Sequence, residues 1–186
     1  MSSYGAVELA NAFRTVRNNT VLVAEDIPDD KYAFVPAPGC RSVAALLSHI
    51  AFAPMFHEDV HRERRISTLQ GYDFSAISGR MEAEAQKPRS KSEIITLLKA
   101  EGERFAGWMQ TLSPEFLAET FTDATGQNPK TRLEGLLAAK EHEMHHRGQL
   151  MLIERLLGVV PHLTRQRDER ARQRRVQSAA SAAVSA

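Results

Sequence analysis

Residues 141–150, EHEMHHRGQL, hold the densest group of metal-ligating side chains in the sequence. On a helix, His142 and His146 would be separated by about 40° around the axis and roughly 6 Å along it, so both imidazoles can reach one ion. His145 would lie about 100° from His146 and is a poorer partner. The same letters contain H-E-x-x-H, the zinc-peptidase signature, in which Glu143 would act as general base for a metal-bound water.

The two histidines belong to a stripe with three- and four-residue spacing, which predicts that they face inward. Neutral imidazoles in a dry interior are costly without partners, so two in register favour a ligand that satisfies both. Two hydrogen-bonded core histidines are the alternative. The other members of the stripe are apolar: Ala139, Leu150, Ile153 and Leu157.

A second H-E-x-x-H match, HEDVH, shows how little this motif discriminates. Its histidines, His57 and His61, share a stripe with Arg64, while apolar residues cover another face, so we expect a flank or surface pair rather than ligands. The longer peptidase pattern also fails in the first match. Gln149 stands where that pattern requires glycine, and Leu152 stands where it requires a third histidine.

The best candidate for a third ligand is His49, in LLSHIAFA. Its neighbours Leu46, Ile50 and Ala53 place it on an inward face of another expected helix. Three histidines from two facing helices would leave coordination positions open for water or substrate, which is typical of a catalytic metal rather than a structural one.

Apolar periodicity predicts a helical protein with no convincing strand. We expect Ser42 to cap the second helix, Ser90 or Ser92 to cap the third, Pro54 to bend or divide the second near Ala51, and Gly158 to end the last. Residues 66–90 have a mixed pattern. The expected helices span residues 7–27, 43–65, 90–111 and 132–157, which indicates an all-α protein with an antiparallel four-helix bundle.

Composition limits the function classes. The chain has 186 residues, 42% of them apolar, which suits one domain, and a formal net charge of +1, which gives no global case for a nucleic-acid or membrane partner. No apolar run approaches the length of a membrane span and no export signal is visible, so we expect a cytoplasmic protein. The single Cys40 fits a reducing compartment.

We divide the chain into a bundle, residues 1–162, and a flexible tail, residues 163–186, that is disordered or partly helical. The tail has six arginines against one Asp and one Glu, followed by small residues. A solvated extension is the simplest interpretation. Contact of these arginines with nucleic acid is a weak alternative.

Three segments together resemble the DinB-like (DinB/YfiT-like) family of metalloenzymes: SVAALLSHIA, HEMHHRGQL and ERLLGVVPHL. The resemblance covers roughly residues 5–163 and includes the preceding Pro36, Pro38 and Gly39. It implies an up-down-down-up four-helix bundle, usually dimeric, with a divalent ion, commonly nickel or zinc, held by three histidines. Carried over residue by residue, these are His49, His142 and His146.

The resemblance also implies an activity. Family members with a known activity are similar to thiol transferases, in which the metal activates a low-molecular-weight thiol, and others are described as hydrolases. We therefore expect a metal-dependent enzyme of either type acting on a small molecule; a non-catalytic, stress-related metal-binding or dimerisation module is the alternative. The sequence identifies no catalytic residue. Arg147 and Gln149 are candidates for contacts that support the ligands or for hydrogen bonds between helices, with a solvated Arg147 as an alternative, and Gly148 is a candidate for a close helix approach.

Overall fold

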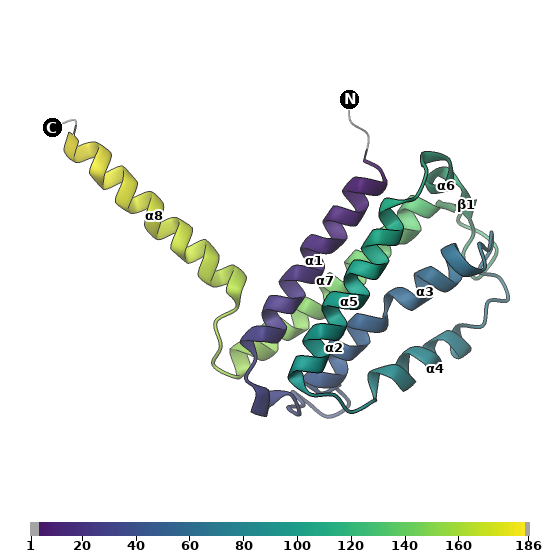
Figure 1. Cartoon of the computed structure of the whole chain (residues 1–186), viewed down its shortest axis with the longest axis horizontal. Coiled ribbons are helices and arrows are strands. Elements are labelled where there is room, and N and C mark those ends of the chain that lie inside the picture. The colour runs from purple at the N-terminus through teal and green to yellow at the C-terminus, as the bar shows by residue number, and fades with distance from the viewer. Residues whose placement is uncertain (1–3, 185–186) are drawn as a thin grey trace.

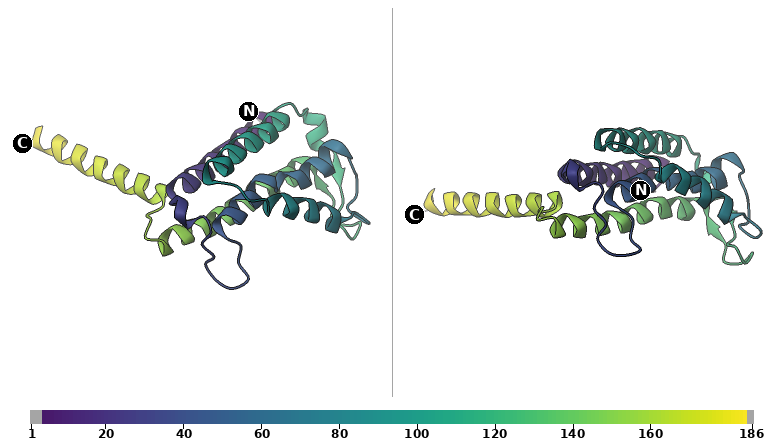
Figure 2. Two further views of the ribbon diagram at one scale, coloured as in Figure 1. Left: turned by 60° about the horizontal axis from the view of Figure 1, so that its bottom comes forward. Right: turned by 90° about the horizontal axis from the view of Figure 1, so that it is seen from below.

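The computed structural model describes residues 4–184 and is a bundle of four long helices (Figure 1). Two of the helices run in one direction and two in the other, which confirms the up-down-down-up arrangement (Figures 1 and 2). The bundle is therefore not antiparallel throughout, because α2 and α5 lie side by side and parallel. The four members are α1 (Ala6–Asp26), α2 (Val43–Phe52) with its continuation, α5 (Lys91–Gln110) and α7 (Arg132–Leu156).

The second member of the bundle is interrupted where the sequence predicted it. Helix α2 ends at Phe52, and Pro54 begins α3 (Pro54–Glu58), because a proline has no backbone N–H to continue the ladder. The chain then widens into a π-helical turn, η2 (Asp59–Glu63). This break and the π turn shift the angular position of every later side chain relative to a regular α-helix.

The parallel pair α2 and α5 requires a long crossover, and residues 64–90 supply it. Within them lies α4 (Phe74–Ala85), which packs on α2 and α3 and which the apolar pattern did not predict. Only Ile77 and Ala85 of this helix are buried, so its periodicity is weak. Its start is marked instead by Asp73, whose side chain accepts a hydrogen bond from the Ala76 N–H.

The ends of the long helices are set by local chemistry that the sequence shows. Ser42 caps α2, and Ser90 forms a capping box with Glu93 at the start of α5. Thr131 forms another with Glu134 at the start of α7. Gly158, with φ +78°, follows the end of α7 and adopts the left-handed conformation that glycine tolerates best.

The core consists of two apolar clusters that lie one after the other along the bundle. One contains Leu47 and Leu98, and the other contains Phe13 and Phe105. Helix α1 packs most extensively against α5. On each of α1, α5 and α7, the residues between the two clusters along the sequence form a polar layer, and the candidate site lies at this level.

The remaining elements are short, except the last. They are η1 (Asp29–Lys31), α6 (Pro114–Ala118), and the strands β1 (Thr120–Phe121) and β2 (Lys130–Thr131), which pair antiparallel. Helix α8 (His162–Val184) projects away from the bundle (Figures 1 and 2). The tail is thus helical over its described residues, while its separation as a distinct unit stays a prediction. Within residues 4–184, no helix is long and apolar enough to cross a membrane.

Candidate metal centre

Three predicted ligands meet between α2 and α7. His49 comes from α2, and His142 and His146 lie one turn apart on α7. The Nε2 atoms of His49 and His142 are 3.3 Å apart, and those of His142 and His146 are 3.2 Å apart. The ligand atoms of all three lie within 4.8 Å of one another, and each residue is partly buried.

This spacing fits an ion better than it fits mutual hydrogen bonding. A tetrahedral metal with bonds of about 2.0–2.1 Å to nitrogen places its ligand atoms about 3.3–3.4 Å apart. The Nε2 atom of His142 has one proton or one lone pair, so it cannot form a full hydrogen bond with both neighbours. Imidazole nitrogens suit zinc, nickel and copper. The donor set and its geometry therefore fit a divalent transition metal.

Gln149 fixes the orientation of one ligand. The Nδ1–H of His146 donates to Oε1 of Gln149 at 2.8 Å, which leaves the lone pair of Nε2 directed to the centre. The Gln149 amide nitrogen in turn lies 3.2 Å from Nε2 of His145. Gln149 thus supports a ligand, as the sequence suggested. His145 is exposed and lies outside the group of three. Arg147 instead contacts the carbonyl oxygen of Val16 on α1.

Burial keeps the three imidazoles neutral near pH 7. Desolvation, with smaller contributions from the nearby Arg41 guanidinium and the other histidines, lowers the pKa of His49 and of His142 to about 4. The pKa of His146 is also lowered by burial, although its hydrogen bond to Gln149 acts in the opposite direction. Neutral nitrogens with free lone pairs are the form that binds metal.

A cavity of about 750 Å³ opens beside His146. We call it the arginine cavity, because Arg41 and Glu82 line it and form an ion pair of 3.0 Å. Gln149 and the exposed Cys40 also line it. A solute in this cavity would have direct access to the three-histidine centre.

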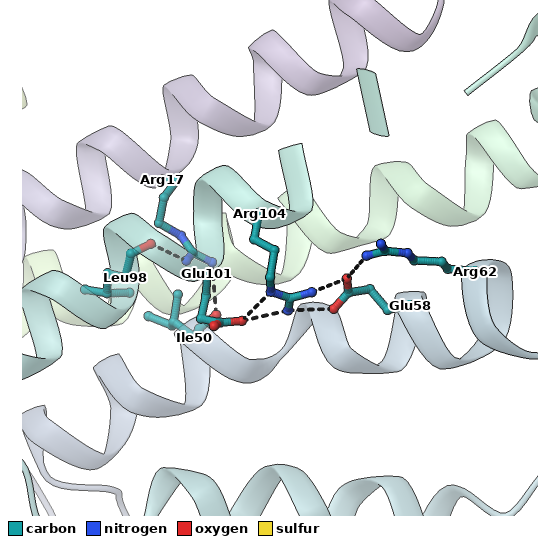
Figure 3. Close-up of polar contacts among 7 residues, drawn as sticks. All are labelled: Arg17, Ile50, Glu58, Arg62, Leu98, Glu101 and Arg104. Carbon is teal, nitrogen blue, oxygen red and sulfur yellow. Dashed lines mark hydrogen bonds and ion pairs between the residues drawn. The ribbon is translucent and has the colours of Figure 1, made fainter. Parts of the chain in front are cut away.

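Glu143 does not face the centre. It is buried in an ion pair with Arg17 of α1, whose Nε donates to both carboxylate oxygens at 2.9 and 3.0 Å. The same guanidinium donates to the carbonyl oxygens of Leu98 on α5 and Ile50 on α2 (Figure 3). Arg17 therefore ties all four members of the bundle together. Glu143 is an anchor of the fold in this structure, and the peptidase interpretation of its motif is wrong.

The expectation for the second motif was also wrong. His57 and His61 are buried, with exposed fractions of 8% and 1%, rather than on a flank or surface. The prediction assumed regular α periodicity, which the Pro54 break and the π turn interrupt. Nδ1 of His61 accepts a hydrogen bond from Arg132 at 3.1 Å. Neither histidine belongs to the one potential metal-binding group found among the described residues.

The intervening Glu58 is held in a second ion-pair network. It pairs with Arg62 and with Arg104 of α5, and Arg104 also binds Glu101 (Figure 3). The glutamates of both H-E-x-x-H matches therefore bind arginines.

Two features of the site were not predicted correctly. Gly148 does not mark a close helix approach, because a Cβ there would meet no atom within 4 Å among the described residues. Arg17 was missed, although an arginine between Phe13 and Val21 on the apolar face of α1 is a signal for a buried ionic partner.

Comparison with known proteins gives consistent results. A family model described as the DinB superfamily matches residues 12–150. The chain is 25% identical over 152 residues to the uncharacterized protein YjoA of Bacillus subtilis strain 168, which covers 81% of this chain and 90% of that protein.

Solved structures with the same fold include the crystal structure of YjoA, a DinB-like protein, with a TM-score of 0.60 and 26% identity over 81% of this chain and 92% of that chain. YfiT from Bacillus subtilis is described as a probable metal-dependent hydrolase with an unusual four-helix bundle topology. Its TM-score is 0.65, with 16% identity over 86% of this chain and 91% of that chain. The crystal structure of a DinB-like protein from Bacillus cereus ATCC 10987 has a TM-score of 0.62 and 18% identity over 83% of this chain and 93% of that chain.

Proposed function

The chain belongs to the DinB superfamily, and from this premise we propose that it is a metal-dependent enzyme acting on a small molecule. The proposed ligands of the divalent ion are His49, His142 and His146. The observation that carries the proposal is the convergence of three Nε2 atoms, 3.2 and 3.3 Å apart, beside a cavity large enough for a substrate.

Three protein ligands leave at least one coordination position for a water or a thiolate, whose pKa a bound ion lowers toward neutrality. The remaining roles belong to this chain. Gln149 holds the His146 ring in the ligating tautomer, and the Arg41–Glu82 ion pair gives the arginine cavity a polar wall that can hydrogen-bond a polar group of a bound molecule. Nickel or zinc is the metal we propose, since both accept imidazole nitrogen.

Between the two reaction types, we favour a thiol transferase over a hydrolase. The centre has a cavity on each side: the arginine cavity includes His146, and a second cavity of about 350 Å³ includes His142. A transferase must place two molecules against one ion, whereas a hydrolase needs one substrate and water. The hydrolase alternative has the support of the description of YfiT.

We further propose that the protein is a cytoplasmic homodimer. Its lone Cys40 fits a reducing compartment. Leu152 and Leu156 are 59% and 60% exposed and share one face of α7 with the exposed Gly148, which gives a second copy an apolar surface to cover. Both leucines also line the arginine cavity, so a second copy on this surface would border that cavity. Leu156→Glu is expected to convert a dimer to a monomer in analytical ultracentrifugation, and an unchanged sedimentation coefficient would contradict this interface.

The metal proposal is tested by metal content. Purified wild-type protein should hold about one equivalent of nickel or zinc by mass spectrometry of the metal, and His49→Ala should hold little. His145→Ala is the matched control and should retain the metal. Chelation should lower the melting temperature of the wild type but not that of His49→Ala. A wild-type protein that neither retains metal nor loses thermal stability on chelation would refute the metal site.

The activity is tested with probe substrates. The metal-loaded protein should accelerate consumption of cysteine thiol by 1-chloro-2,4-dinitrobenzene more than it accelerates hydrolysis of 4-nitrophenyl acetate. The reverse ranking would favour a hydrolase. Acceleration of neither by a metal-loaded protein would favour the non-catalytic metal-binding module.

A further inference from the structure

The cavity on the His142 side of the centre has an unusual lining. We call it the apolar cavity; it lies between α3, α4 and α7 and has a volume of about 350 Å³. Small side chains, Ala138 and Ala139 of α7, leave the space, and larger apolar side chains form the opposite wall. Those larger residues are Phe56, Phe74, Ile77 and Met81.

No side chain that lines the apolar cavity is an acid, a lysine or an arginine. Its polar members are Ser78, His57 and His142, and burial lowers the pKa of His57 to about 3, so this imidazole is neutral at pH 7. An ionic ligand would lose its hydration in this cavity without gaining a counter-charge, which strongly disfavours its binding. The arginine cavity differs, because the charged side chains of Arg41 and Glu82 line it.

In the part of the chain that the structure describes, His57 has no hydrogen-bond partner at either ring nitrogen, whereas the His142 ring, whose Nδ1 is also buried and unpaired, has its Nε2 in the three-histidine centre. The His57 side chain is more than nine-tenths buried, its Nδ1 is a buried atom with no hydrogen bond, and neither ring nitrogen has a partner among the described residues. The ring packs against other rings, including those of Phe56 and His61. By contrast, His61 is held by Arg132. Leaving such a group unpaired is unfavourable, and a ligand that hydrogen-bonds to it would offset that cost.

We propose that the apolar cavity binds the electrophilic substrate, a small, uncharged, largely apolar molecule with one hydrogen-bonding group, and that His57 orients it through that group. This inference rests on the proposed function for the identity of the molecule as an electrophile. Because His57 and His142 line the same cavity, a molecule that reaches His57 lies against a proposed metal ligand. His57 acts here as a specificity-determining residue, and the chemistry remains at the centre.

The binding claim can be tested without metal. Full-length protein, treated with EDTA, is titrated with 4-fluorobenzaldehyde and followed by fluorine NMR. We expect saturable binding to the wild type and much weaker binding of the anionic analogue 4-fluorobenzoate. His57→Phe should weaken binding of the aldehyde about 3- to 10-fold, the value of one hydrogen bond. His57→Gln should restore part of it.

A second variant fills the cavity by enlarging a side chain at an exposed position. Ala138→Phe fills it and should abolish binding of 4-fluorobenzaldehyde, whereas Met144→Phe adds the same ring to α7 outside the cavity and should leave binding unchanged. Circular dichroism checks that both variants fold. Absence of aldehyde binding to the wild type, equal binding to Ala138→Phe, or a preference for the benzoate would each overturn the proposal.

These results are separable from the fate of the proposed function. If the protein binds 4-fluorobenzaldehyde in this way but holds no metal, the binding-site proposal stands and the proposed enzyme function is refuted. If the protein holds metal and consumes thiol, but Ala138→Phe binds 4-fluorobenzaldehyde as well as the wild type does, the enzyme function stands and the assignment of the apolar cavity is refuted.

Discussion

The buried pair of Arg17 and Glu143 shows how one residue's partner decides its role. In isolation, the glutamate of H-E-x-x-H suggests a general base, but here its carboxylate accepts two hydrogen bonds from a guanidinium on α1. The convergence of His49, His142 and His146 could be predicted, because the stripes that contain them depend on spacing along single helices, while their role as metal ligands stays a prediction. The role of Glu143 could not, because it depends on an arginine 126 residues away in the sequence.

The anchoring role of Glu143 leads to a stability prediction. Glu143→Leu leaves the Arg17 charge buried and unpaired, so we expect the free energy of unfolding to fall by about 3–5 kcal/mol in urea titrations. The double variant Arg17→Met/Glu143→Leu should recover much of that loss, because it buries no uncompensated charge. A Glu143→Leu protein with unchanged stability but no activity would instead indicate a chemical role.

Glu154 predicts a dependence of stability on pH. Both of its carboxylate oxygens are buried without a hydrogen bond, and desolvation, with Asp26 nearby, raises its pKa from 4.5 to about 7. The folded state therefore keeps a proton that the unfolded state releases between these values. The stability that Glu154 contributes is present below about pH 4.5 and is lost as the pH rises through 7.

Glu154→Gln removes this titration. The melting temperature of the variant relative to wild type should rise between pH 5 and pH 8, by an amount equivalent to about 1–2 kcal/mol. Glu141→Gln, an exposed change on the same helix, should show no such trend. A constant difference between Glu154→Gln and wild type across this range would show that Glu154 is ionised in the folded protein.

At the scale of elements, the helix ends and the Pro54 break were predictable because capping residues and prolines act locally. Helix α4 was not, since only two of its residues are buried and its remaining side chains carry little apolar signal. The π turn at Asp59–Glu63 also has no local signature that we recognised, and it is one cause of the wrong placement of His61, which lies within it.

Two glycines of α5 should respond oppositely to the same change. A Cβ at Gly102 would lie 2.6 Å from Cγ of Arg17, while a Cβ at Gly107 would meet nothing within 4 Å. Gly102→Ala should therefore destabilise the protein by about 1–3 kcal/mol through overpacking against the buried arginine. Gly107→Ala should stabilise it by up to about 1 kcal/mol, the helix-propensity difference. Thermal unfolding of both variants measures the signs, and a stabilised Gly102→Ala would mean that Arg17 can move away.

At the scale of the whole molecule, the topology followed from the family resemblance and not from periodicity, which alone suggested an antiparallel bundle. Periodicity gives the inward face of each helix but not its neighbours. The parallel contact of α2 and α5 depends on the crossover through α4, which is the segment that the pattern described least well.

Helix α8 receives little stabilisation from packing against the bundle. It is attached near its start, where Arg165 pairs with Asp26 and His162 lies 3.2 Å from the Asn19 side-chain oxygen. Beyond Arg165, its described side chains up to residue 178 are exposed. Arginines 170, 174 and 175 have no ion-pair partner among the described residues.

Most helical stability in proteins comes from packing, and the side chains of α8 beyond Arg165 are exposed as far as residue 178. We therefore expect backbone amides of residues 168–184 to exchange with deuterium within seconds, whereas those of α7 around Leu150 exchange over hours. Protection of α8 equal to that of α7 in the purified protein would show that a second copy covers it. Protection that appears only with added duplex DNA, and disappears at high salt, would identify the arginines as phosphate contacts.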